Sequence, residues 1–220
     1  MIRMNKFQDE IQRRGITRLC HFTKSSNLPF ILGDGKFEKN GILSTDYIRQ
    51  SDYLEELDKQ RLDGHTNYVS CSIQRPNSKY MRFREEHSKD DLFNQWVVLC
   101  IDPSVIDATS LFSPVNAATA SGKNVKSGFD AFENMFADPI SFVRYNKLQE
   151  EDRASDLPLN FTTDSQAEVL IKDRIPKDKI TDIVFPADTY EVEKLRLSFC
   201  IGDLKDLGIN IKRMEVNNGY

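Results

Sequence analysis

The sequence predicts an α+β fold in which short helices flank a mixed, curved β-sheet. Short apolar runs rich in β-branched and aromatic residues recur along the 220-residue chain, and short amphipathic stretches separate them irregularly. The chain shows no internal repeat and no regular strand–helix–strand rhythm that would indicate a parallel sheet. Because no stretch has the composition of a linker, we expect a single domain over residues 1–220.

In the N-terminal half, strand patterns alternate with short helices. Phe7 and Ile11, four residues apart and followed by Gly15, indicate the first helix. The run WVVLCI at 96–101 is the most apolar strand, and an Asp-Pro pair ends it. The expected elements are a helix over residues 5–14, a strand over 16–22, a helix capped by Ser25 or Ser26, an extended piece near 41–44, a mainly helical stretch over 45–66, and strands over 67–73 and 96–101.

The C-terminal half continues the pattern with longer polar interruptions. Residues 116–126 are rich in glycine, alanine and serine and predict a loop, whereas phenylalanines at helical spacing mark a helix over residues 128–138. Residues 144–160 are polar and predict irregular structure. The other expected elements are strands over 108–112, 167–171, 180–185 and 209–216, and a helix near 189–199.

Composition narrows the class of protein. Four cysteines are scattered without a CxxC pair, which favours buried free thiols in a reducing compartment over a metal site or disulfides. The N-terminus lacks the apolar core of a signal peptide, and no apolar run approaches the length of a membrane span. We therefore expect a cytoplasmic protein with no membrane partner. The net charge of −4 argues against sequence-blind binding to nucleic acid, yet it permits a local basic groove.

The common catalytic signatures, GxGxxG, GxxxxGK[ST], HExxH and GxSxG, are missing, and the three histidines are too dispersed for a metal cluster. What remains is a set of polar residues at strand ends. His21 and Thr23 end the first strand just before a helix N-terminus, which suits an anionic or carbonyl group. Arg75 follows the strand NYVSCSI and is placed to clamp a pyrophosphate. The alternatives are a satisfied core histidine and a surface arginine.

Glu168 is the candidate acid. It interrupts the apolar strand AEVLI after the turn-prone lead-in TTDSQ, and the alternative interpretation is an edge-strand glutamate facing solvent. Cleavage of the glycosidic bond of NAD needs a carboxylate beside an oxocarbenium-like transition state and groups that position the pyrophosphate and nicotinamide. Glu168, Arg75 and His21 together suit that chemistry, so NAD is the expected co-substrate and no metal is expected.

A possible nucleic-acid surface follows Arg75. Lys79, Arg82 and Arg84 alternate with Tyr80 and Phe83, and single strands are held by cations on phosphates and aromatic rings on unpaired bases. The alternative is a solvated charged helix. The loop at 116–126 carries Lys123 and Lys126. These two cations suit a loop that closes over NAD or a nucleic acid.

The sequence resembles the DarT family of DNA ADP-ribosyltransferase toxins. The matching pieces are ITRLCHFTKSSNLPFIL, GILS, NYVSCSIQRPNSKYM and SQAEVLI, which follow one another in the family's order over roughly residues 15–185. The resemblance implies a compact ADP-ribosyltransferase fold whose split, mixed sheet holds NAD in a central cleft. It also implies transfer of ADP-ribose to a base of single-stranded DNA, and pairing with an antitoxin, DarG, that removes the modification.

Carried over by position, Glu168 matches the catalytic glutamate and Arg75 the arginine that contacts NAD and is needed for activity. His21 and Thr23 match the NAD-binding motif of the first strand, and Asn27 matches the asparagine at the start of the next helix. For the DNA substrate, the expected contacts are Lys79, Tyr80, Arg82, Ser165 and Gln166, the last two in the turn before the catalytic strand.

The chain departs from the family after NYV. The thymidine-modifying branch continues with aromatic residues and prolines. In this chain the corresponding sequence is SCSIQRPNSKYM, which keeps the arginine and a proline but not the aromatic residues. This departure favours guanine over thymine as the acceptor. A transferase acting on RNA or protein, and a non-catalytic nucleic-acid-binding module of the same fold, remain alternatives.

Overall fold

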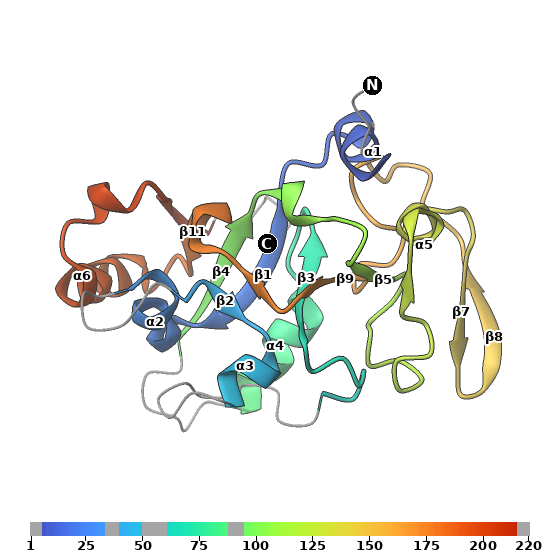
Figure 1. Cartoon of the computed structure of the whole chain (residues 1–220), viewed down its shortest axis with the longest axis horizontal. Coiled ribbons are helices and arrows are strands. Elements are labelled where there is room, and N and C mark those ends of the chain that lie inside the picture. Colours follow the sequence, from blue (N-terminus) through green and yellow to red (C-terminus); the bar gives the residue numbers. More distant parts are fainter. Residues whose placement is uncertain (1–5, 34–39, 50–60, 88–94, 215–220) are drawn as a thin grey trace.

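The computed structural model describes residues 6–33, 40–49, 61–87 and 95–214, and its centre is an eight-stranded sheet (Figure 1). The strand order is β12-β11-β4-β1-β3-β9-β5-β6. All neighbouring strands pair antiparallel except β11 and β12, which are parallel. The strands are β1 (Leu19–Lys24), β3 (Tyr68–Ile73), β4 (Trp96–Ile101), β5 (Leu111–Ser113), β6 (Lys126–Ser127), β9 (Glu168–Lys172), β11 (Ile180–Phe185) and β12 (Asn210–Arg213). The predicted mixed α+β fold is therefore confirmed.

The sheet is split between its two central strands. β1 pairs with β4 along its whole length, from Leu19 to Lys24, but with β3 only at Leu19 and Cys20. The first four residues of β3 pair instead with β9. From His21 onward, no strand of the described residues pairs with the backbone edge of β1 that faces β3. Polar side chains of β1 and β3 can therefore meet at the split, because backbone hydrogen bonds do not join the two strands there.

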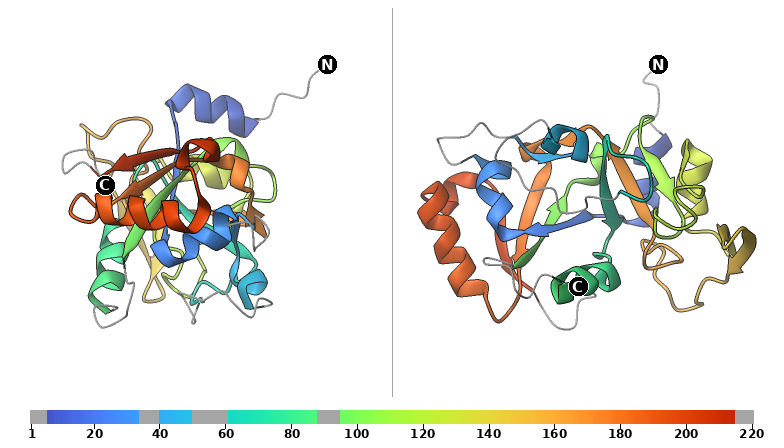
Figure 2. Two further views of the ribbon diagram at one scale, coloured as in Figure 1. Left: turned by 90° about the vertical axis from the view of Figure 1, so that its left-hand side faces the viewer. Right: turned by 90° about the horizontal axis from the view of Figure 1, so that it is seen from below.

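Alternate strand residues face two apolar clusters, as the two-residue period of a strand requires. The larger cluster lies under α1 (Lys6–Arg14), α2 (Leu28–Leu32), α5 (Phe129–Asn134) and α6 (Tyr190–Ile201). On the other face, Met81 of α4 (Ser78–His87) clusters with Trp96 and Val98. Figure 2 shows α2 beside α6 at the end of the molecule remote from α5. The remaining elements are α3 (Thr45–Arg49), the strand pair β2 (Ile42–Leu43) and β10 (Arg174–Ile175), and the hairpin β7 (Ile140–Arg144) and β8 (Lys147–Glu151).

The β7–β8 hairpin contradicts the prediction of irregular structure over residues 144–160. Strand β8 reads KLQEE, so it lacks the apolar alternation by which strands are recognised. The turn residues Tyr145 and Asn146 both have positive φ, 52° and 57°, without the glycine that usually marks such a turn. The hairpin is held instead by Ile140 and Phe142, which are buried against Val115.

Two strands begin later than the sequence predicts, because side chains bind the backbone groups that strand pairing would otherwise use. β1 begins at Leu19 and not at residue 16, since the side chain of Gln74 accepts from the amides of Thr17 and Arg18 at 2.9 and 3.0 Å. β5 begins at Leu111 and not at residue 108, since Asp107 caps the preceding turn. Of the helical stretch expected over 45–66, α3 covers Thr45–Arg49, whereas residues 61–66 form turns and bends, so the prediction is wrong there. Residues 50–60 and the end of the last strand, beyond residue 214, lie outside the described chain.

Candidate active site

Glu168 is the first residue of β9, and both of its carboxylate oxygens accept hydrogen bonds. The hydroxyl of Ser70, on the neighbouring β3, donates to Oε2. Nδ2 of Asn116, in the loop after β5, donates to Oε1 at 2.7 Å. Since β9 lies between β3 and β5, Glu168 is a partly buried residue of an inner strand. The alternative of an edge-strand glutamate facing solvent is therefore excluded.

The environment of Glu168 moves its titration into the neutral range. Burial raises the pKa of this carboxyl to about 7, and the nearby Asp63 acts in the same direction. The Ser70 hydroxyl, the backbone amide of Ala117 and the charge of Arg61 favour the carboxylate and oppose the shift in pKa. A carboxyl group poised in this way is suited to accept a proton or to stabilise a developing cation near neutral pH.

Ser70 also connects Glu168 to His21 across the split in the sheet. The ring nitrogen Nδ1 of His21 lies 2.9 Å from the carbonyl oxygen of Ser70. A carbonyl only accepts, so Nδ1 must carry the proton of this hydrogen bond. Burial lowers the pKa of His21, which keeps the ring neutral and leaves Nε2 as an acceptor.

The predicted cofactor residues on the first strand are brought together. Thr23, two residues after His21 on β1, is buried, and its hydroxyl oxygen accepts from Nδ2 of Asn27 at 3.0 Å. Asn27 is the last residue of the 3-10 helix Ser25–Asn27, just before α2. The strand end and the helix start are thus joined by side chains.

Arg75 follows β3 and lies against the turn that leads to Glu168. Its guanidinium carbon is 4.9 Å from the centroid of the Phe161 ring, a cation–π arrangement. Burial lowers the pKa of Arg75, whereas Asp164 favours its charged form. The Nε atom of Arg75 is buried and has no hydrogen-bond partner within the described chain. An unpaired donor of this kind is available to an anionic ligand.

The turn before Glu168 is tightly ordered. Thr162 donates its hydroxyl to the carbonyl oxygen of Asp164 at 2.7 Å, and the carboxylate of Asp164 accepts from the amide of Gln166 at 2.7 Å. Ser165 and Gln166 themselves are partly buried. The predicted acceptor-side turn therefore leads directly into β9 and Glu168.

The residues of the predicted nucleic-acid surface lie on helix α4. Lys79 and Arg82 are exposed, and the side chain of Arg84 lies outside the described residues. Tyr80 packs edge-on against Phe22 at 5.7 Å and stacks on Phe83 at 6.2 Å between centroids. The ring of Tyr80 therefore contacts an aromatic ring of the sheet, Phe22, as well as one of its own helix, Phe83.

Sequence reasoning missed three residues of this site: Ser70, Asn116 and Phe161. Ser70 sits in the strand NYVSCSI, but its contact with Glu168 depends on the register in which Ser70 lies opposite Leu170. Asn116 lies in a segment predicted as a loop, where no local pattern indicates a contact with a strand 52 positions away. Only pairing between distant segments creates these contacts.

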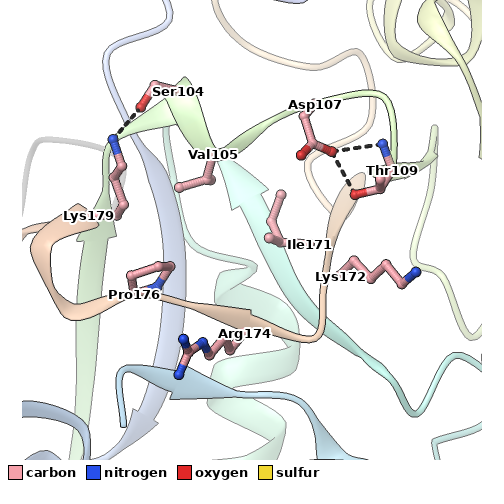
Figure 3. Close-up of a pocket in the computed structure, with 9 residues that line it drawn as sticks. All are labelled: Ser104, Val105, Asp107, Thr109, Ile171, Lys172, Arg174, Pro176 and Lys179. Atoms are coloured by element: carbon pink, nitrogen blue, oxygen red, sulfur yellow. Dashed lines mark hydrogen bonds between the residues drawn. The ribbon is translucent and has the colours of Figure 1, made fainter. Parts of the chain in front are cut away.

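A separate surface cavity of about 270 Å³ lies at the other end of β9 (Figure 3). It is lined by Ser104, Val105, Asp107, Thr109, Ile171, Lys172, Arg174, Pro176 and Lys179. None of the predicted site residues lines it. In Figure 3 the cationic side chains of Lys172, Arg174 and Lys179 point in different directions, so they do not converge on one ligand.

Within the described ranges, no three or more histidine, cysteine, aspartate or glutamate side chains are grouped to hold a metal ion. None of the helices in that part of the chain is long and apolar enough to cross a membrane.

The mixed sheet, split between β1 and β3 and carrying Glu168 on the next strand, β9, has the fold of solved DarT ADP-ribosyltransferases. The sequence profile described as "ssDNA thymidine ADP-ribosyltransferase, DarT" matches residues 20–220. The chain therefore belongs to the DarT family. No curated protein matches the sequence.

Solved structures agree with this assignment at low sequence identity. DarTG of Thermosipho africanus in complex with ADP-ribose is 13% identical with a TM-score of 0.57, and the match covers 90% of this chain. This chain spans only 50% of that one. DarT of Thermus sp. 2.9 matches in complex with NAD+ (15% identity, TM-score 0.52, 90% and 95% of the two chains). It also matches in complex with ADP-ribosylated ssDNA (14%, 0.54, 94% and 97%).

Proposed function

We propose that this protein transfers ADP-ribose from NAD to a nucleobase of single-stranded DNA and releases nicotinamide. The observation that carries the proposal is the carboxylate of Glu168, held by Ser70 and Asn116 at the split of the sheet with its pKa raised to about 7. Membership of the DarT family and the NAD+ bound to a relative bear out NAD as the co-substrate. The proposal that DNA is the acceptor is supported by membership of the family and by the relative in complex with ADP-ribosylated ssDNA.

Each predicted residue has a role in this reaction. Arg75, with its buried, unpaired Nε, would pair with the pyrophosphate, while His21, Thr23 and Asn27 would position the nicotinamide end. When the bond between C1′ of the ribose and nicotinamide breaks, its electron pair leaves with nicotinamide, and positive charge develops on the sugar. The Glu168 carboxylate stabilises that charge.

The acceptor then completes the exchange. A nitrogen of the base forms the new bond to C1′, and its proton passes to Glu168. Ser165 and Gln166, at the start of the catalytic strand, would contact the acceptor base, and Lys79, Tyr80 and Arg82 of α4 the flanking strand.

The proposed acceptor base is guanine. Its support is the segment SCSIQRPNSKYM, which lacks the aromatics of the thymidine-modifying branch, although the family description names thymidine. Mass spectrometry of oligonucleotides of defined base content after reaction with NAD tests this directly. A mass gain of one ADP-ribose is expected on guanine-containing single strands, and a gain confined to thymine-containing strands would overturn the choice of base.

The same assay, extended to RNA and protein pools, tests the class of substrate. Labelled NAD should mark single-stranded DNA and leave RNA and protein unlabelled. Labelling of RNA or protein alone would replace the proposal with its nearest alternative. DNA binding without any NAD turnover would indicate a non-catalytic module.

We also propose an antitoxin partner resembling DarG, an ADP-ribosyl glycohydrolase. Its support is the relative named DarTG, whose chain is about twice as long as the part this chain matches. Co-expression with such a hydrolase should relieve toxicity and remove the modification from DNA, and toxicity that persists would count against this partner.

A further inference from the structure

The tip of the β7–β8 hairpin carries an aromatic residue in a costly conformation. The strands pair from Ile140 opposite Glu151 to Arg144 opposite Lys147, which leaves a two-residue turn of Tyr145 and Asn146. Both residues have positive φ, a conformation that asparagine tolerates and a bulky residue such as tyrosine does not. Residues kept in such regions often serve a function that compensates for the strain.

Among the described residues, Tyr145 is also the most exposed of the large side chains with an apolar body. Its relative exposure is 86%, so its ring is not held by packing in the structure. An aromatic ring that is exposed in this way on a two-residue turn is available to stack on a partner.

Three cationic residues border the turn, and the guanidinium carbon of Arg144 lies 5.1 Å from the centroid of the Phe142 ring. Arg144 and Lys147 flank the turn, and the ammonium group of Lys123 donates to the side-chain oxygen of Asn146 at 3.1 Å. None of these cations forms an ion pair with a carboxylate of the described chain. The acidic residues of β8, Glu150 and Glu151, lie at the opposite end of the strand. Cations beside an exposed aromatic ring form the pattern that binds unpaired nucleic acid, with phosphates on the charges and a base on the ring.

The hairpin is rigidly attached to the loop that holds the catalytic carboxylate. The side-chain amide of Asn124 donates to the carbonyl oxygen of Val143 at 2.9 Å and accepts from the Val143 amide at 2.7 Å. The same loop contains Asn116, which binds Glu168. Figure 1 shows the hairpin beyond α5 and β5, at the end of the molecule opposite α6.

Charges on the hairpin and on α4 act on a common region. Burial raises the pKa of Glu151, and Asp164 acts in the same direction, whereas Arg144 and Lys79 oppose the rise. Arg144 of the hairpin, Lys79 of α4 and Asp164 of the turn before Glu168 are thus all close enough to Glu151 to influence it. The base of the hairpin, where Glu151 lies opposite Ile140, is therefore near the proposed acceptor turn and DNA-binding helix, and the tip extends from that base along β7 and β8.

We propose that the hairpin tip, defined as Tyr145 with Arg144, Lys147 and Lys123, is a second binding point for the single-stranded DNA substrate. Tyr145 stacks on an unpaired base outside the active site, and the cations contact the neighbouring phosphates. The proposal rests on the proposed function, because it concerns the path of that same substrate.

The test is the affinity of the full chain for a fluorescent single-stranded oligonucleotide of mixed sequence, measured by anisotropy. Tyr145→Asn removes the ring and places a residue that favours the turn, so thermal stability should be unchanged or higher. The Kd should rise roughly 5- to 100-fold, the range for loss of one stacked base. Tyr145→Trp should keep the affinity.

A matched control is available on α6. Phe199 is 81% exposed and lies at the far end of the molecule, so Phe199→Asn removes an equally exposed aromatic ring without touching the hairpin. Its DNA affinity should equal that of the wild type. NAD affinity, measured by calorimetry, should be unchanged in all three variants.

The charges are tested through salt dependence. Arg144→Gln and Lys147→Gln should each reduce the slope of log K against log salt by about 0.7, the value for one phosphate contact on a single strand. Unchanged affinity of Tyr145→Asn, or unchanged slopes, would overturn the hairpin site while the wild type still modifies DNA and the proposed function stands. A wild type that neither binds nor modifies single-stranded DNA would overturn both.

Discussion

The guanidinium of Arg75 lies over the ring of Phe161, with its central carbon 4.9 Å from the ring centroid. Phe161 is fixed in turn by Arg153, whose Nη1 donates to the Phe161 carbonyl oxygen at 2.9 Å and whose Nη2 donates to that of Pro158 at 2.6 Å. The loop that leads to Glu168 therefore also orients the proposed pyrophosphate-binding arginine.

Loss of this ring should weaken NAD binding through Arg75. Phe161→Leu keeps an apolar side chain but removes a cation–π contact of about 0.5–2 kcal/mol, so KM for NAD should rise roughly 2- to 30-fold with a smaller change in kcat. In an Arg75→Ala background the same change should add little, because the two residues act as one unit. Steady-state kinetics of all four proteins checks this.

Phe136 provides the matched control for that cycle. The guanidinium of Arg14 lies 4.0 Å from the Phe136 ring centroid, a similar pair between α1 and the residues after α5. Phe136→Leu should lower thermal stability and leave KM for NAD unchanged. Fully additive effects of Phe161→Leu and Arg75→Ala would show that the ring does not act through the arginine.

Substitution of Glu168, the proposed catalytic carboxylate, should separate chemistry from folding. Glu168→Gln retains an oxygen that accepts from Ser70 or Asn116 but removes the charge that stabilises the ribosyl cation. We expect transfer of ADP-ribose to fall by roughly 100-fold or more, with NAD affinity and the unfolding transition nearly intact. Single-turnover transfer assays and calorimetry measure the two quantities. Full transferase activity in this variant would remove Glu168 from the mechanism.

The same pair of proteins should differ in the pH dependence of stability. The pKa of Glu168 is about 7 in the folded protein against an ordinary value of 4.5, so the folded state binds this proton more tightly than the unfolded chain. The stabilisation is complete below about pH 4.5 and is lost as pH rises through 7. Relative to Glu168→Gln, the wild type should lose up to about 3 kcal/mol over this interval. Denaturant unfolding at several pH values gives the difference, and parallel curves for the two proteins would contradict it.

The sequence was informative where a local pattern was sufficient. Apolar runs predicted β3, β4, β9 and β11 to within a residue or two, whereas His21, expected near the end of its strand, lies in the middle of β1. Local patterns do not contain strand register. The hydrogen bond from Ser70 to Glu168, two residues 98 positions apart, therefore could not be predicted from them. The β7–β8 hairpin was missed for a different reason, since its second strand is polar and its turn contains tyrosine where glycine is usual.

The hydroxyl of Ser70 should set the pH at which the enzyme becomes active. It donates to Glu168 and so favours the ionised form, which lowers the pKa of that carboxyl against the effect of burial. Ser70→Ala removes this donor and retains the backbone carbonyl that holds His21. The midpoint of the rate–pH profile should therefore move above that of the wild type, with the largest loss of rate on the acidic side. Ser72→Ala, on the same strand, removes the hydroxyl of a buried serine that does not donate to Glu168 and should leave the midpoint in place. If Ser70→Ala lowers the rate equally at every pH, the hydroxyl positions the carboxylate without controlling its ionisation.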